Sequence, residues 1–95
     1  SLSAPSAAAL RPAVLDAAPV VVEIRSGAFT AIQVNCSDGF SGRATVVDHL
    51  ATVADVPEEA RCLLYLVGEK AEPKKVAAGE RLVCWVTRGI VSCDR

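Results

Sequence analysis

Methionine is absent from these 95 residues, and histidine, tryptophan and tyrosine each occur only once. Because translation starts with methionine, we expect the chain to be a processed product or a piece of a longer protein. No apolar run approaches the roughly 18 residues of a membrane-spanning helix, so we expect no membrane insertion by this segment. Arg11 and Pro12 interrupt the only N-terminal apolar stretch, which argues against a signal peptide here.

An excess of charge of either sign is also missing. Ten Lys and Arg residues oppose eleven Asp and Glu residues, which gives a net charge of −1. Nucleic-acid-binding domains usually carry a basic patch and often stacking aromatic side chains, so we predict no nucleic-acid partner. Hydrophobic residues make up 52% of the chain and charged residues 22%, a balance typical of globular domains. A domain of this length buries a small core, which needs additional stabilisation.

The combinations of residues that carry out catalysis are missing as well. His49 is the single histidine, and Asp48 beside it would point to the opposite face of a strand, so a triad with Ser41 is disfavoured. No nucleophile elbow or phosphate-binding glycine loop is present, and Asp38-Gly39 lacks the acidic repeats of a calcium loop. We therefore predict a protein that is not an enzyme and holds no cofactor or metal, with His49 exposed in a turn.

Four cysteines, Cys36, Cys62, Cys84 and Cys93, are the most informative residues present. An even number in a small domain predicts disulfides and an extracytoplasmic location: periplasmic, secreted or on the cell surface. A zinc site of all four cysteines, or of three with His49, is one alternative. Such sites usually contain two cysteines about two to four residues apart, whereas the spacings here are 26, 22 and 9. Buried free thiols in a reducing compartment are the other alternative.

The C-terminal sequence predicts how the cysteines pair. Two β-prone runs flank Arg88-Gly89, which predicts a hairpin with a two-residue turn. Centring the turn there places Cys84 opposite Cys93 in a non-hydrogen-bonded pair, where Cα atoms lie about 4.5 Å apart. That separation lies at the short edge of the range for disulfides. We therefore predict Cys84–Cys93, which leaves Cys36–Cys62 as the second disulfide.

Alternation of apolar and polar residues predicts further strands along the chain. Residues 20–25 and 31–36 alternate regularly, and residues 43–48 and 50–56 predict a second hairpin. Residues 68–75 are expected to form a charged loop. About seven runs separated by turn residues, without a long helix, predict an all-β fold: a single small antiparallel β-sandwich.

The composition changes near residue 20. Residues 1–19 are rich in Ala, Ser and Pro and are predicted to form an arm or linker, whereas residues 20–95 form the sandwich domain. The alternative is that Leu10, Val14 and Leu15 dock onto the domain.

The segment from Ala51 to Leu66 resembles the end of a small prealbumin-like sandwich, as in PEGA-type and carboxypeptidase regulatory-like domains. In that group a short strand leads into a Leu/Val-Pro corner, here Val56-Pro57, and an alternating strand follows. The resemblance covers about a sixth of the chain. Residues 58–60 stand where those corners usually carry Gly, and the PEGA signature itself is not present. The resemblance implies an immunoglobulin- or prealbumin-like sandwich in an extracytoplasmic, non-catalytic module.

A binding surface is predicted on the outward face of the C-terminal hairpin. The register places Trp85 outward, flanked by Val83 and Ile90, with Arg88 in the turn. Trp and Arg concentrate binding energy at interfaces, and an exposed apolar patch needs a reason. The alternative is that the N-terminal arm or the Glu69–Lys75 loop covers this face, so that Trp85 belongs to a satellite core.

Together these features predict a non-catalytic interaction or structural module of a larger surface or membrane-associated protein, with a protein or a glycan as its partner. The alternative is a small disulfide-stapled hydrolase inhibitor that presents residues 38–41 or 69–75 to its target. The high Ala, Val and Arg content favours a bacterial origin.

Overall fold

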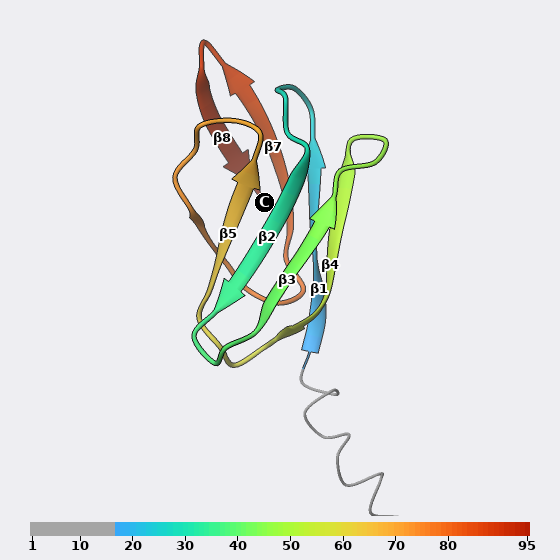
Figure 1. Ribbon diagram of the computed structural model, residues 1–95, viewed down its shortest axis with the longest axis vertical. Helices are drawn as coiled ribbons and strands as arrows, with labels where there is room; N and C mark the ends of the chain where they lie inside the picture. Colours follow the sequence, from blue (N-terminus) through green and yellow to red (C-terminus); the bar gives the residue numbers. More distant parts are fainter. Residues whose placement is uncertain (1–16) are drawn as a thin grey trace, which may run out of the picture.

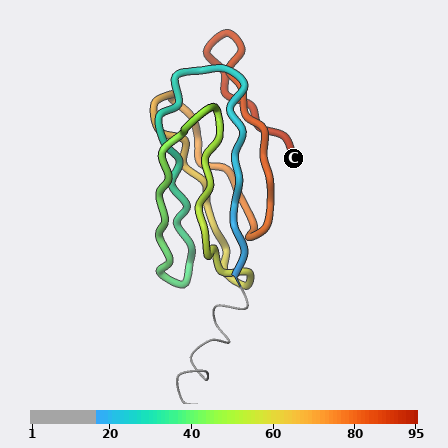
Figure 2. The backbone as a smooth tube through the Cα atoms, turned by 90° about the vertical axis from the view of Figure 1, so that its right-hand side faces the viewer, coloured from blue at the N-terminus to red at the C-terminus, as the bar shows by residue number. Residues whose placement is uncertain are grey.

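The computed structural model describes residues 17–95, which form two four-stranded β-sheets packed face to face (Figures 1 and 2). The strands are β1 (Ala17–Ile24), β2 (Ala31–Cys36), β3 (Ser41–Thr45), β4 (Leu50–Pro57), β5 (Cys62–Val67), β6 (Lys74–Val76), β7 (Arg81–Thr87) and β8 (Ile90–Asp94). One sheet has the order β4-β1-β7-β8 and the other the order β3-β2-β5-β6. The predicted all-β sandwich is confirmed, with eight strands in the described residues.

One strand pairing differs from the predicted antiparallel arrangement. β1 pairs antiparallel with β4 but parallel with β7, where Val22 lies beside Leu82 and Ile24 beside Cys84. The β4-β1-β7-β8 sheet is therefore mixed. Alternation within a strand predicts which side chains are buried, but it contains no information about the direction of the neighbouring strand.

β1 begins at Ala17, inside the segment predicted to be the arm, residues 1–19. Ala17 and Ala18 already pair with the end of β4, and the register shifts at Pro19. Asp55 in β4 has a φ of 59° at this irregularity, as a β-bulge residue can have. A bulge is one of the few places where a strand accepts proline, which has no N–H to donate. The remainder of the predicted arm, residues 1–16, lies outside the described residues.

The second predicted hairpin is wrong, because its two strands lie in different sheets. β3 pairs with β2 and β4 pairs with β1, and only the bridge between Val47 and Leu50 closes the connection. Asp48 and His49 form the turn with φ of 53° and 66°, and His49 is exposed as predicted. Two alternating runs around a tight turn do not distinguish a hairpin from a crossing between sheets.

β6 begins inside the segment predicted to be a charged loop, residues 68–75, and ends one residue beyond it. It pairs antiparallel with β5 through three residue pairs, including Cys62 with Val76. Val76 is buried, whereas the preceding Lys75 is exposed. One apolar residue among charged neighbours is too short a pattern for alternation to indicate a strand.

The core between the sheets is apolar. Its fully buried side chains are Ile32, Leu64, Val20, Val22, Val34, Val56 and Cys84. No polar or charged residue is buried within residues 17–95. In a two-layer sandwich every second residue of each strand points into the core, and β-branched residues suit these positions.

Both predicted disulfides are present. Cys36–Cys62 joins β2 to β5 with a Cα–Cα distance of 4.0 Å, and Cys84–Cys93 joins β7 to β8 with a Cα–Cα distance of 4.1 Å. In each case the two cysteines are direct cross-strand partners within one sheet. Because all four sulfurs are bonded in pairs, the zinc and free-thiol alternatives are wrong.

Candidate functional site

The β7–β8 hairpin has the predicted register. Trp85 lies opposite Ser92 and Thr87 lies opposite Ile90. Arg88 and Gly89 form the turn with φ of 52° and 79°, as in a type I′ turn. The twist of this turn matches that of the flanking strands, so the hairpin can project as a regular ribbon (Figure 1).

The four predicted binding residues lie together on the outward side and at the tip of this hairpin. Ile90 is 67% exposed, Arg88 is exposed, and Trp85 and Val83 are half-buried. Val86, which points the opposite way from Trp85, packs against the core. The outward surface therefore combines a partly covered tryptophan with an exposed isoleucine.

The Glu69 loop does not cover Trp85. The Glu69 carboxylate accepts a hydrogen bond from the Ala28 N–H at 2.7 Å. Gly27, the neighbour of Ala28, lies against Val86 and Glu69, so this loop sits on the Val86 side of β7. The other covering segment considered, the N-terminal arm, lies outside the described residues.

Ser26 holds the hairpin in place close to its turn, at Val86. Its Oγ accepts a hydrogen bond from the Val86 N–H at 2.9 Å and donates to the Val86 carbonyl at 3.1 Å. This reciprocal pair ties β7 to the segment that follows β1. Anchoring β7 near the turn lowers the conformational entropy that the hairpin would lose on binding.

β1 adds charged side chains beside the hairpin, which the sequence did not predict because β1 and β7 are distant in the chain. Glu23 pairs with Val83 across the parallel ladder. Its carboxylate contacts Arg25 at 3.5 Å and Arg81 at 3.2 Å. These exposed ion pairs contribute little stability, but an apolar centre bordered by charges is the usual composition of an interface.

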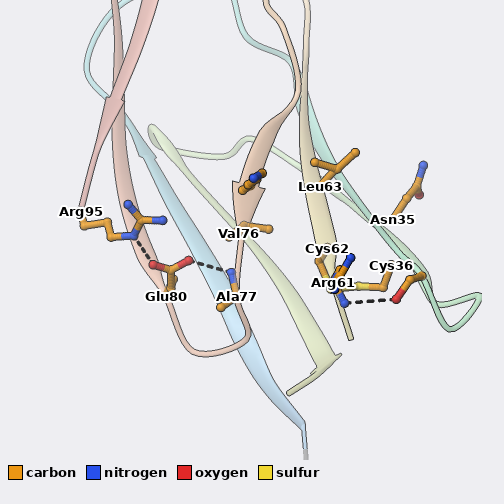
Figure 3. Close-up of a pocket in the computed structure, with 11 residues that line it drawn as sticks. Asn35, Cys36, Arg61, Cys62, Leu63, Val76, Ala77, Glu80 and Arg95 are labelled. Atoms are coloured by element: carbon orange, nitrogen blue, oxygen red, sulfur yellow. Dashed lines mark hydrogen bonds and ion pairs between the residues drawn. A yellow bond between two sulfur atoms is a disulfide. The ribbon is translucent and has the colours of Figure 1, made fainter. Parts of the chain in front are cut away.

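A groove of about 900 Å³ (Figure 3) opens near the end of β2, at the end of the sandwich opposite the hairpin tip (Figure 1). It lies between the β5–β6 edge and the start of β7, and the Cys36–Cys62 disulfide is part of its lining. Its basic side chains are Arg61, Lys75 and Arg95. Sequence analysis missed this groove, because its residues come from five separate segments.

Glu80 is the only carboxylate that lines the groove among the described residues. It accepts a hydrogen bond from the Ala77 N–H at 2.7 Å and forms an ion pair with the Arg95 guanidinium. The hydrogen bond from Arg95 lowers the pKa of the Glu80 carboxyl below its usual value, and the Ala77 N–H acts in the same direction. The Glu80 carboxylate therefore already has hydrogen-bond partners within the domain.

Within residues 17–95, no group of three or more His, Cys, Asp or Glu side chains is placed to hold a metal ion. The same part of the chain contains no helix long and apolar enough to cross a membrane. No family model matches the chain, and no curated protein or solved structure is significantly similar to it. The function must therefore be inferred from the chain's own residues.

Proposed function

We propose that this domain is a non-catalytic interaction module of an extracytoplasmic protein. Its partner, a protein or a glycan, binds the outward face of the β7–β8 hairpin. Val83 and Trp85 provide the half-buried apolar centre, Ile90 provides an exposed apolar contact, and Arg88 provides a charge at the tip.

The backbone conformation of Arg88 is the observation that carries this proposal. A residue with a side chain at positive φ costs about 1–2 kcal/mol, and type I′ turns favour Asn-Gly. Arg88 nevertheless occupies the first turn position with a φ of 52°. Local strain that persists beside an exposed isoleucine is a reason to infer function at that place.

Two further features support an extracytoplasmic module. The two disulfides are typical of oxidising compartments. Two packed four-stranded sheets are compatible with the prealbumin-like sandwiches that residues 51–66 resemble. Modules of that group are typically extracytoplasmic and non-catalytic.

The hydrolase-inhibitor alternative finds less support in the described residues. The turn after β2 is tight: Asp38 accepts a hydrogen bond from the Phe40 N–H at 2.9 Å, and Phe40 packs against the core. Glu69 is held against Ala28. Neither loop projects as an inhibitory loop would.

Site-specific photo-crosslinking tests the proposal. A benzophenone amino acid placed at Ile90 should capture a partner from the extracytoplasmic fraction of the source cells. The same probe at Glu58, which is exposed in the turn after β4, is the matched control and should not capture the partner. An excess of the domain without the probe should compete for the partner and reduce the amount captured, whereas an excess of the Trp85→Ala domain should not reduce it. Equal capture from both positions, or competition by Trp85→Ala, contradicts the assignment.

A further inference from the structure

The outer face of the β3-β2-β5-β6 sheet carries basic but no acidic side chains. The charged residues on these four strands are Arg43, Lys74 and Lys75, and none of the four strands contains Asp or Glu. Arg43 and Lys75 lie on the outer face, whereas Lys74 is on the same side of β6 as the buried Val76. None of these three cations forms an ion pair within the part of the chain described. In a protein with a net charge of −1, this is a pronounced local asymmetry.

A hydrogen-bonded row of polar side chains crosses this face. Arg43 Nη1 donates to Gln33 Oε1 at 3.3 Å, and Gln33 Nε2 donates to Asn35 Oδ1 at 3.0 Å. Ser41 Oγ also donates to Asn35 Oδ1, at 2.9 Å. Because arginine can only donate, it fixes the orientation of the Gln33 amide and, through it, that of Asn35.

This row leaves mainly hydrogen-bond donors free. The Asn35 oxygen accepts two hydrogen bonds and the Gln33 oxygen accepts one, whereas the Asn35 NH₂ group and the remaining guanidinium N–H groups of Arg43 are not used within the row. Such a surface is matched by a ligand whose oxygens only accept, as in a carboxylate.

The row continues across the sheet toward the groove. Asn35 lies beside Leu63, and Leu63 lies beside Lys75, so that one line of residues crosses all four strands from Ser41. Three intervals between neighbouring strands make this line about 14 Å long. Asn35, Leu63 and Lys75 also line the groove, where Arg61 adds another cation (Figure 3). Glu80 does not neutralise Arg61 or Lys75, because it is bonded to Arg95 and Ala77.

Apolar surface lies between the cations. Tyr65 is 36% exposed beside Gln33, and Leu63 is 38% exposed beside Asn35. An aromatic ring with a polar tip can contact the C–H face of a sugar while its hydroxyl forms hydrogen bonds. The few cations, interrupted by these apolar side chains, fall short of the clusters of about four to eight basic residues typical of anionic membrane binding.

We propose that this surface, here called the donor face (Gln33, Asn35, Arg43, Arg61, Tyr65 and Lys75), binds an acidic glycan. Uronate carboxylates bind Arg43, Lys75 and Arg61, and a sugar ring lies over Tyr65. The proposal goes beyond the hairpin site, because the donor face belongs to the other sheet.

The test is titration of the ¹⁵N-labelled domain with tetragalacturonate, followed by NMR, with the neutral maltotetraose as a control ligand. Tetragalacturonate should shift the amide signals of β2, β3 and β5, and maltotetraose should not. Arg43→Gln and Lys75→Gln should each weaken binding about tenfold, the effect of one charge-assisted hydrogen bond. Lys70→Gln, which removes another exposed lysine, from the loop after β5, should change the affinity less than about twofold.

Five results would overturn the donor-face assignment. Four of them are no amide shifts with tetragalacturonate, equal binding of maltotetraose, equal binding of a tetraglutamate peptide, and an equal effect of Lys70→Gln. Trp85→Ala separates the two proposals, because it should leave tetragalacturonate binding unchanged while abolishing competition at the hairpin. If Trp85→Ala instead weakens tetragalacturonate binding, the glycan occupies the hairpin surface and the donor-face assignment is wrong.

Discussion

The two disulfides close loops of different length, and this predicts unequal contributions to the free energy of unfolding. Cys36 and Cys62 are 26 positions apart, whereas Cys84 and Cys93 are 9 apart. Loss of loop-closure entropy in the unfolded chain corresponds to about 3.5 kcal/mol for the longer loop and about 2.6 kcal/mol for the shorter one. A domain of this size has a total stability of roughly 5–14 kcal/mol, so removal of either disulfide should be readily measurable.

The perturbation is a pair of double variants, Cys36→Ala with Cys62→Ala and Cys84→Ala with Cys93→Ala. Alanine is preferred to serine, because a hydroxyl at the buried positions 62 and 84 would be desolvated. Each pair removes one buried and one half-buried sulfur, so the packing losses should be similar. The longer-loop variant should therefore be the less stable of the two, by about 1 kcal/mol.

Equilibrium unfolding in urea, followed by circular dichroism, measures this difference. The denaturant slope m of each variant must be compared with that of the parent, because a changed slope would indicate a changed unfolded state. If the Cys84/Cys93 variant is the less stable one at equal m, loop entropy does not determine the order. Native contacts of the hairpin disulfide would then be the larger contribution.

Three other substitutions test separate features. Arg88→Asn should raise the free energy of unfolding by about 0.5 kcal/mol, because asparagine tolerates positive φ, and it should lower partner capture by the Ile90 probe. A lower free energy of unfolding would show that the turn is not strained. Gly68→Ala should lower the free energy of unfolding in urea by at least about 2 kcal/mol more than Gly39→Ala does. Both glycines have positive φ, but only a Cβ at position 68 would meet a backbone oxygen, that of Ala28, at 2.2 Å. Glu80→Gln should lower the melting temperature near neutral pH but not at low pH. The hydrogen bond from Arg95 holds the folded-state pKa of Glu80 below the ordinary value of a glutamate, so the stabilising contribution is present above that ordinary pKa and is lost as the pH falls through the folded-state pKa. A melting-temperature difference that does not shrink with falling pH would show that the Arg95 contact is unimportant.

The features predicted correctly from the sequence are those set by neighbouring residues. A two-residue turn at Arg88-Gly89 fixes the register of its own strands, and the register then determines that Cys84 faces Cys93. The inward and outward positions follow from alternation with period two. The outward direction of Trp85 and Ile90 therefore needed no knowledge of the remaining strands.

The features missed depend on which strands become neighbours. The parallel β1–β7 pairing and the crossing at Asp48-His49 join segments whose local patterns are also compatible with other topologies. The donor face could not be predicted from the sequence for the same reason. Gln33, Arg43 and Lys75 come from different strands and share a surface only after the order β3-β2-β5-β6 is known.

Each disulfide joins two strands of the same sheet, so no disulfide links one layer to the other, and only the backbone connections between strands join them covalently. In an oxidised unfolded chain the strand pairs β2–β5 and β7–β8 stay tethered, and the search for these partners is shortened. The docking of one sheet on the other receives no such help and depends on apolar side chains such as Ile32 and Leu64. Substitutions that shrink these side chains should therefore loosen the two layers from each other while leaving both cross-linked ribbons intact.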